Sequence, residues 1–282
     1  HCLRPRISRI PRLHLTRARL DDDLGPSDDR AMQALRPFFY FYGSKWKAAP
    51  LYPAPRYQRV IEPFAGSAGY SGLHHDRDIV LVERDPVIAG LWRWLIGATE
   101  AEVLALPLEI PTTVRDLGLA PGPSALIGFW ITAASAAPCQ TPNSRMRSGR
   151  RVHSFWGETI RARVAAQVSA IRHWTIIEGD FADAPWEPAT YFVDPPYAEA
   201  GKHYRIKFND FERLGAMCRM WRGQVIVCEN DGATWLPFRH FREVQANNHP
   251  TGKEGKPGKS AEAVWLSDEH PANTAANDAM IA

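Results

Sequence analysis

The sequence predicts an α/β fold with a mostly parallel sheet, helices on both faces of that sheet and an antiparallel edge. Three observations lead to this prediction. Short apolar runs alternate with helical segments, which favours parallel strands joined by crossover helices. Several of the apolar runs end at acidic residues, glycine or proline, which stop a strand. The last runs follow one another through short connections, which is typical of antiparallel neighbours.

The expected elements follow in a regular order. A strand at Val60–Ile61 leads into a glycine-rich turn and a helix, and a strand at Ile79–Val82 leads into an apolar helix over Val87–Ile96. Thr99 caps the next helix, with Glu102 in the capping-box position. The remaining elements are helices over Ser124–Ala136, about Gly157–Arg172 and Asp210–Trp221, a polar loop over Pro138–His153, and strands at Thr175–Glu178, Tyr191–Val193, Val225–Cys228, Phe241–Gln245 and Ala263–Leu266.

The composition is that of an ordinary globular protein. The chain has 282 residues, of which 45% are hydrophobic and 23% are charged, so we expect one large domain or one domain with an inserted lobe. No apolar run approaches the ~20 residues of a membrane span, and we expect no secretion signal. The four cysteines show no CxxC spacing, so we expect no metal site and a cytoplasmic location.

Residues 1–35 differ from the rest of the chain. A basic block is followed by an acidic one, and neither shows an amphipathic period. We interpret residues 1–35 as a disordered or non-native N-terminal extension, with a basic DNA-binding arm as the alternative. Residues 271–282 are expected to be a flexible tail.

A glycine-rich turn, EPFAGSAG, follows the first strand. Glu62 and Pro63 end the strand, and Gly66 and Gly69 precede a helix, so a ligand can approach the backbone and the first N–H groups of that helix. Taken alone, the turn is equally compatible with a tight turn of no function. The Gly- and Lys-rich stretch at 251–260 lacks the first glycine of a P-loop, so we do not expect it to bind a nucleoside triphosphate.

Two further strand ends carry acids. Glu83 ends the second strand about twenty residues after the turn, where an acid can accept from both ribose hydroxyls of a nucleoside. Asp180 and Phe181 follow the third strand, and such a pair can accept from an adenine amino group and cover the ring. Each acid alone is more often a solvated strand end, but three successive strand ends that suit an adenosine carry more weight.

Asp194-Pro195-Pro196-Tyr197, hereafter the elbow, directly follows an apolar strand. Most Pro-Pro pairs only end a strand, since neither proline has an N–H to donate. An exocyclic aromatic amine is a poor nucleophile, because its lone pair is delocalised into the ring. A carboxylate and a backbone carbonyl that accept its N–H groups favour a pyramidal nitrogen that can attack, and the prolines hold both acceptors in place. Tyr197 offers a face for a base, which reaches such a pocket only when it is flipped out of a duplex.

Five motifs, in this order, resemble the Dam-like adenine-N6 DNA methyltransferases of bacteria and phages: FYFYGSKWKAAP (39–50), EPFAGSAG (62–69), VERDP (82–86), EGDF (178–181) and DPPY (194–197). The resemblance covers roughly residues 38–268. It implies a Rossmann-like, S-adenosylmethionine-dependent methyltransferase sheet over 36–105 and 157–270, with a small target-recognition insert over 106–156. It further implies double-stranded DNA as the partner and a bacterial cell or a phage-infected host as the setting, and we expect a monomer.

The resemblance also implies a role for each matching residue. Tyr42, Gly43 and Lys45 would hold the methionine end of the cofactor, Glu62, Pro63, Phe64, Gly66, Ser67 and Gly69 would line its site, Glu83 would take the ribose, Asp180 and Phe181 the adenine, and Asp194, Pro195, Pro196 and Tyr197 would carry out the chemistry.

Basic charge is concentrated in the middle of the chain. Residues 137–173 contain seven arginines and a single acid, Glu158. Four of these arginines fall where the family places its recognition lobe, so we expect DNA contacts there rather than a solvated surface loop. The segment ends in FWGE, as in the family, but lacks the usual aromatic-asparagine pattern. The candidate DNA-binding residues are Arg145, Arg147, Arg150, Arg151, Lys202, Lys256 and Lys259.

Two other functions stay open. The elbow suits any exocyclic amine, so N4-cytosine methylation is the nearest alternative. A catalytically silent DNA-binding protein with this fold is the alternative from another class, but a pure binder has no need for the Asp194 carboxylate. A protein-glutamine methyltransferase fits less well, because that chemistry usually places Asn at this position.

Overall fold

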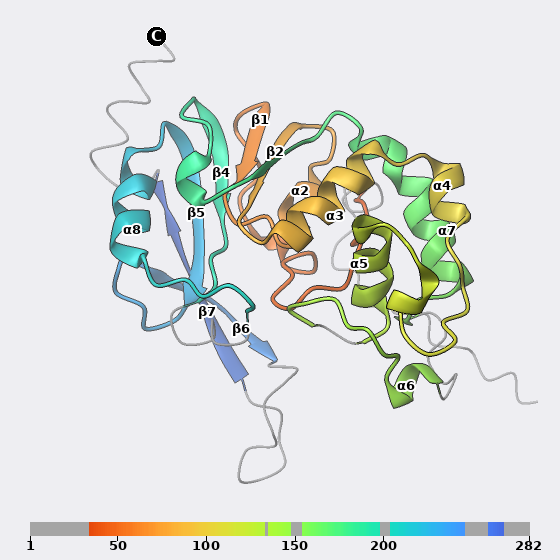
Figure 1. The fold of residues 1–282 in the computed structure, drawn as a ribbon. Coiled ribbons are helices and arrows are strands. Elements are labelled where there is room, and N and C mark those ends of the chain that lie inside the picture. The colour runs from red at the N-terminus through yellow and green to blue at the C-terminus, as the bar shows by residue number, and fades with distance from the viewer. Residues whose placement is uncertain (1–33, 133–134, 148–153, 198–203, 246–258, 268–282) are drawn as a thin grey trace, which may run out of the picture.

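The computed structural model describes residues 34–132, 135–147, 154–197, 204–245 and 259–267. Their centre is a sheet of seven strands in the order β3-β2-β1-β4-β5-β7-β6 (Figure 1). The order 3-2-1-4-5 is that of doubly wound α/β proteins. The strands are β1 (Arg59–Glu62), β2 (Asp78–Glu83), β3 (Thr175–Glu178), β4 (Ala189–Val193), β5 (Gly223–Asn230), β6 (Arg239–Gln245) and β7 (Lys259–Leu266).

Pairing within the sheet confirms the predicted mixture of directions. β1 pairs in parallel with β2 and β4, and the neighbouring pairs β2–β3 and β4–β5 are also parallel. β7 runs antiparallel to both β5 and β6, which makes this side the antiparallel edge. The predicted α/β fold with a mostly parallel sheet is therefore confirmed.

Helices cover both faces of the sheet (Figure 1). They are α2 (Gly69–Leu73), α3 (Pro86–Gly97), α4 (Glu100–Leu104), α5 (Pro121–Trp130), α6 (Ser144–Arg147), α7 (Glu158–Gln167) and α8 (Phe211–Met220). Alternate strand residues enter two separate cores. Phe192 of β4 belongs to the core beneath α3, α5 and α7, whereas its neighbours Tyr191 and Val193 belong to the core beneath α8.

The predicted helix over Ser124–Ala136 is wrong at both ends, because α5 begins at Pro121 and ends at Trp130. Beyond it the chain turns so that Ser135 forms a β-bridge with Phe41, and the Ser135 carbonyl accepts from the Tyr42 N–H at 3.2 Å. Partners far away in the sequence therefore end the helix. α5 itself packs in the same core as α3, and a separate recognition lobe over 106–156 stays a prediction.

Two other expectations need correction. The expected loop over Pro138–His153 contains the short helix α6, whose start is capped by the Asn143 side chain accepting from the Met146 N–H at 2.8 Å. The expected helix over about Gly157–Arg172 is α-helical only over α7 and continues as a 3-10 turn over Val168–Ile171. The capping box of Thr99 and Glu102 is confirmed.

The segment from Leu35 to Tyr42 fastens the start of the described chain onto the helices. The Trp130 indole donates to the Phe38 carbonyl at 2.8 Å, and the Trp46 indole donates to the Leu35 carbonyl at 2.8 Å. Leu35 is buried in the larger core. The rest of the predicted N-terminal extension up to residue 33, and the predicted tail over 271–282, lie outside the described residues. Within the described parts of the chain, no helix is both long and apolar enough to cross a bilayer.

Candidate functional site

A cavity lies at the carboxyl edge of the sheet, at the ends of β1, β2 and β4. The strand order reverses between β1 and β4, and ligands of open α/β sheets bind at such a switch point. Asp194 and Pro196 of the elbow line the cavity, whereas Pro195 is buried behind it. The cavity walls include every residue predicted to bind the cofactor: Tyr42, Gly43, Lys45, Glu62, Pro63, Phe64, Gly66, Ser67, Gly69, Glu83, Asp180 and Phe181.

The glycine-rich turn needs its glycines because other segments pack directly on it. Gly66 has a φ of +46°, and a Cβ at this position would lie 3.1 Å from the Phe41 ring. A Cβ on Gly69, the first residue of α2, would lie 2.5 Å from the backbone nitrogen of Trp46. The segment that carries Lys45 is therefore held against the start of α2, so both sides of the turn face the cavity as one rigid wall.

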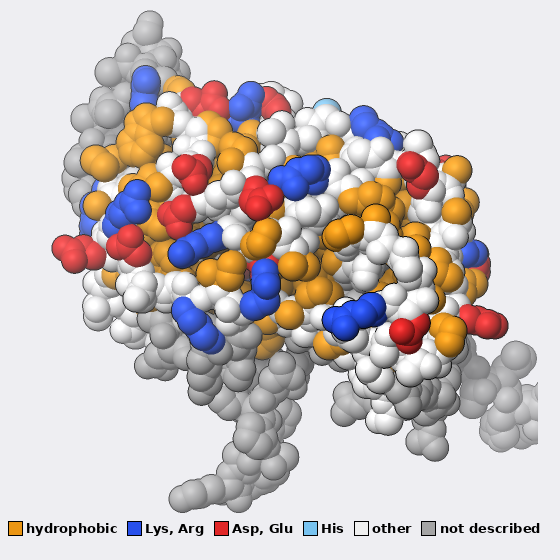
Figure 2. Space-filling model, in the orientation of Figure 1, with side chains coloured by type: hydrophobic (Ala, Val, Ile, Leu, Met, Phe, Trp, Pro, Cys, Tyr) orange, Lys and Arg blue, Asp and Glu red, His pale blue; other side chains and the backbone are white. Residues whose placement is uncertain are grey.

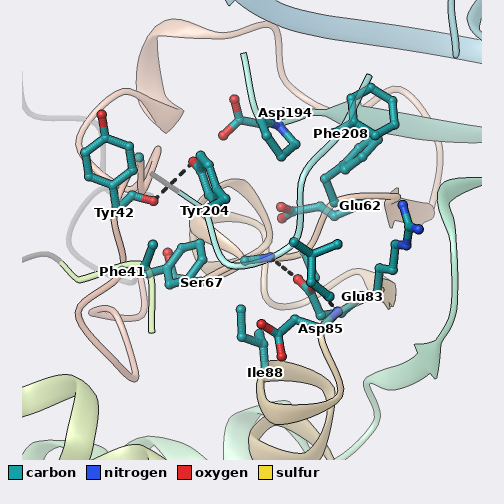
Figure 3. A pocket seen from close by; sticks show the side chains of 18 of the residues that line it. Phe41, Tyr42, Glu62, Ser67, Glu83, Asp85, Ile88, Asp194, Tyr204 and Phe208 are labelled. Atoms are coloured by element: carbon teal, nitrogen blue, oxygen red, sulfur yellow. Dashed lines mark hydrogen bonds between the residues drawn. The ribbon is translucent and has the colours of Figure 1, made fainter. Parts of the chain in front are cut away.

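Two carboxyl groups project from the ends of β1 and β2 (Figure 3), of which Glu62 is buried and Glu83 is partly buried. Glu83 accepts from the backbone N–H groups of Gly66 at 3.0 Å and Asp85 at 2.8 Å, one to each oxygen. Burial raises the pKa of Glu83 to about 7, although these two hydrogen bonds oppose the rise. Glu62 accepts from the Ser71 N–H at 2.7 Å, and burial raises its pKa to about 8. Both groups therefore change charge near neutral pH.

An aromatic cluster forms one wall of the cavity. The rings of Phe64 and Phe181 lie nearly parallel, with centroids 5.7 Å apart and an interplanar angle of 17°. Phe208 meets both rings edge-on, at 5.1 and 5.6 Å. Asp180 precedes this wall and caps the turn at Phe181–Asp183 by accepting from the Ala182 N–H at 3.3 Å. Such a wall suits a flat aromatic ligand, because an aromatic ring can make both stacking and edge contacts with it.

The elbow places a carboxylate at the opposite side of the cavity from Glu83 and Asp85, with Glu62 between them (Figure 3). Asp194 follows directly after β4, and the Lys45 ammonium lies 2.9 and 3.1 Å from its two oxygens. Lys45 also donates to the Gly43 carbonyl at 3.3 Å and lies 4.8 Å from the centre of the Tyr197 ring. Burial raises the pKa of Asp194, while Lys45 acts in the opposite direction. A buried, cation-paired carboxylate thus faces the cavity.

The segment Tyr204–Phe208 lines the cavity but was missed by the sequence analysis. The Tyr204 hydroxyl donates to the Tyr42 carbonyl at 3.4 Å, and Arg205 pairs with Asp85, its Nε 2.7 Å from Oδ2. Phe208 contacts Phe64 of the aromatic wall. The segment therefore crosses the cavity from Tyr42, past the start of α3, to that wall. An alternation of apolar and basic residues shortly after the elbow is the one signal in the sequence that points to it.

Three of the predicted DNA-binding residues fall in the described part of the chain. Arg145 and Arg147 belong to α6, at the periphery of the fold (Figure 1), and Lys259 begins β7. Arg150, Arg151, Lys202 and Lys256 lie outside the described residues. On the face in Figure 2, basic side chains are interspersed with acidic ones over most of the described surface. DNA contact by any of these residues stays a prediction.

Three of the seven arginines in the basic region hold the fold together. Arg161 donates to the Leu106 carbonyl at 2.8 Å, Arg163 to the Pro37 carbonyl at 3.2 Å, and Arg172 to the Ala98 carbonyl at 2.6 Å. Burial lowers the pKa of Arg163 to about 10, and its guanidinium lies 5.0 Å from the centre of the Trp130 ring. These three arginines are engaged within the fold. The positive charge that this region can offer to a polyanion is therefore smaller than the sequence suggests.

Among the described residues, no group of three His, Cys, Asp or Glu side chains is arranged to hold a metal ion. Comparison with protein-family models yields no match to this sequence, and comparison with curated proteins yields no significant match either.

Proposed function

We propose that this protein is a DNA methyltransferase that uses S-adenosylmethionine to methylate the N6 amino group of a flipped-out adenine. The observation that carries the proposal is a single cavity with three parts: an acid suited to a ribose, an aromatic wall suited to a base, and a buried carboxylate on a proline-fixed elbow. Each part was predicted from a different stretch of sequence. Their meeting in one cavity supports a common ligand.

The adenosine end of the cofactor fits the side of the cavity formed by β2 and the turn after β3. Each oxygen of Glu83 receives one backbone N–H, which leaves each oxygen free to accept one ribose hydroxyl. Phe64, Phe181 and Phe208 would contact the adenine ring, with Asp180 at its edge. When bound, S-adenosylmethionine supplies an electrophilic methyl group.

The elbow would act on the amine of the target base. Asp194 accepts one N–H of the amino group, and a backbone carbonyl of the elbow accepts the other, which favours a nitrogen whose lone pair is available. Pro195 is buried and Asp194 follows directly on β4, so the acceptor is held by the sheet rather than by a loose loop. Tyr197, directly beyond the prolines, is the residue on which the base would stack.

Two alternatives predict different outcomes of a methylation assay. N4-cytosine methylation uses the same acceptors on a smaller base. A silent DNA-binding protein would require no cofactor, yet would bury Asp194 and Lys45 together. Buried charges are costly even when they are paired, so their presence favours a catalytic site.

Methyl transfer to DNA tests the proposal directly. The protein is incubated with S-adenosylmethionine labelled in the methyl group and unmethylated double-stranded DNA, and the nucleosides are then separated. N6-methyladenine is expected, N4-methylcytosine would identify the first alternative, and an unlabelled product would leave only the second. Asp194→Ala should abolish the label. Asp210→Ala, which removes a half-exposed acid at the start of α8, serves as the matched control.

A further inference from the structure

Four side chains of alternating charge lead from the edge of the sheet to the elbow. Arg242 of β6 donates from Nε to Glu262 Oε2 at 2.8 Å, and the two residues face each other in the β6–β7 register. Glu262 Oε1 lies 3.8 Å from Lys45 Nζ, and Lys45 pairs with Asp194. This ion-pair line joins three parts of the sequence: the N-terminal segment, the elbow and the antiparallel edge.

Burial makes the members of the line depend on one another. The exposed fraction of the side chain falls from 26% at Arg242 to 11% at Glu262 and 7% at Lys45, and it is 18% at Asp194. A buried charge is tolerated only with a partner of opposite sign, and both inner members have two. Lys45 therefore lies between two carboxylates, so a change in its interaction with one of them changes its interaction with the other.

Lys45 also uses two of the groups that the proposed mechanism reserves for the target base. Its ammonium donates to Asp194 and lies over the Tyr197 ring, and it donates in addition to the Gly43 carbonyl. The amino group of an incoming base needs Asp194 as its acceptor. The Lys45–Asp194 ion pair must therefore weaken before the base can bind. Glu262, 3.8 Å away, is the carboxylate toward which Lys45 can shift.

We propose that Glu262, held in place by Arg242, is a positioning residue that sets how tightly Lys45 engages Asp194 and hence how free Asp194 is to accept the target amine. This role rests on the proposed methyl transfer. It differs from the role that the family resemblance implies for Lys45, in which the ammonium binds the methionine end of the cofactor.

The charges around Asp194 support the direction of the effect. Burial raises the pKa of Asp194, Lys45 lowers it, and Glu262 raises it further. For Lys45, burial alone would lower the pKa, but Asp194, Cys228 and Glu262 together reverse this and the net pKa is raised. The titratable groups that act on Asp194 or feel its charge are Lys45, Tyr52, Glu62, Tyr197, Tyr204, Cys228 and Glu262.

Substitutions at Glu262 and at Arg242 should shift the pH profile in opposite directions. Since Asp194 acts as a carboxylate, the rate rises with pH through its pKa. Glu262→Gln removes a negative charge, so the acid limb of kcat should move to lower pH by about one unit. Arg242→Gln leaves Glu262 uncompensated, so the acid limb should move to higher pH. A merely structural role would shift neither limb.

In Glu262→Gln, the stronger Lys45–Asp194 ion pair should also slow methyl transfer itself. At the pH optimum we expect Glu262→Gln to lower kcat by about tenfold, the effect of one charged hydrogen bond. The Kd of S-adenosylhomocysteine, measured by calorimetry, should stay within about twofold of wild type, and Glu262→Asp, which keeps the charge, should recover part of the rate. Asp78→Asn is the matched control, because it breaks an Arg–carboxylate pair of 2.6 Å at the amino ends of β1 and β2.

Two results would overturn the proposal. One is a pair of unshifted acid limbs, with Glu262→Gln as active as Asp78→Asn. The other is a Lys45→Met variant that binds S-adenosylhomocysteine much more weakly but binds 5′-methylthioadenosine, which lacks the amino-acid end, as well as wild type does. That result would assign Lys45 to the cofactor carboxylate.

A double-mutant cycle separates this inference from the proposed function. Lys45→Met, Glu262→Gln and the double variant are compared by urea unfolding, and their losses of unfolding free energy should not add. Additive losses overturn the ion-pair line, whatever reaction the protein catalyses. A wild-type protein that transfers no methyl group to DNA refutes the proposed function, and with it this role for Glu262, even if the cycle shows coupling.

Discussion

Glu83→Gln gives a sharp test of the adenosine side of the cavity. In the protein, each oxygen of Glu83 accepts one backbone N–H, from Gly66 and from Asp85. Glutamine offers only one oxygen, and its amide group must point its own N–H groups at one of these donors. The variant therefore loses both the negative charge and one acceptor, at a position where the shape of the side chain hardly changes.

The magnitude follows from the hydrogen bonds and the pKa. A hydrogen bond to a charged group contributes roughly 1.5–3 kcal/mol, so loss of the carboxylate should weaken cofactor binding about ten- to a hundredfold. Burial raises the pKa of Glu83 to about 7, so the wild-type protein reaches its full affinity only above that pH. Below pH 7 the wild-type group is itself neutral, and the two proteins should bind more nearly alike.

Calorimetry with S-adenosylhomocysteine at pH 6, 7 and 8 measures both effects. Wild-type affinity should rise with pH, and Glu83→Gln should show a smaller rise, because Glu62 with its pKa of about 8 still titrates. Glu178→Gln makes the same change at the end of β3, on an exposed side chain paired with Arg93 at 3.1 Å, and should match wild type. Equal affinity of Glu83→Gln and wild type at pH 8 would show that the ribose lies elsewhere.

Three further predictions test other parts of the site. Asp194→Ala should abolish methyl transfer while the Kd of S-adenosylhomocysteine stays near wild type; normal turnover by this variant would end the assignment of the elbow. In the folded protein Glu62 stays protonated up to its pKa of about 8, whereas in the unfolded chain it ionises near the ordinary pKa of glutamate. The free energy of unfolding should therefore fall as the pH rises from 5 to 8.5. Urea unfolding should show that Glu62→Gln removes roughly 3–5 kcal/mol of this decline, and equal declines would contradict the burial of the group. Arg145→Ala and Arg147→Ala should each reduce the salt slope of DNA binding by about one unit if they contact phosphates, or relax the target site at one position at a cost of roughly 1–3 kcal/mol if they contact bases. Wild-type behaviour of both variants in salt titrations and on a randomised-site library would place DNA recognition outside α6.

The parts of the site that were predictable are those written in local sequence. Apolar runs that end in acids placed Glu62, Glu83 and Asp194 at strand ends, and parallel strands bring their carboxyl ends to one edge. Two consecutive prolines marked the end of β4, because proline cannot donate to a ladder. These features need no knowledge of distant contacts.

The parts that were missed depend on partners far away in the sequence. α5 ends at Trp130 because the following residues pair with Phe41, and no helix stop stands in the sequence at that point. Arg163 is one of the seven arginines that make residues 137–173 basic in the sequence, but its guanidinium donates to the Pro37 carbonyl. Lys45 and Asp194 are separated by 149 positions, so their ion pair is visible only in three dimensions.

The position of β7 has a consequence for how the protein is made. β7 is the last strand along the described chain, yet it lies inside the sheet between β5 and β6. A ribosome therefore completes both neighbours before β7 exists, and until then one edge of β5 stays open to pairing with other chains. Because β7 also carries Glu262, closure of the sheet and delivery of that charge to the cavity happen in one folding step. A product truncated before β7 would thus combine an open strand edge with an incomplete site.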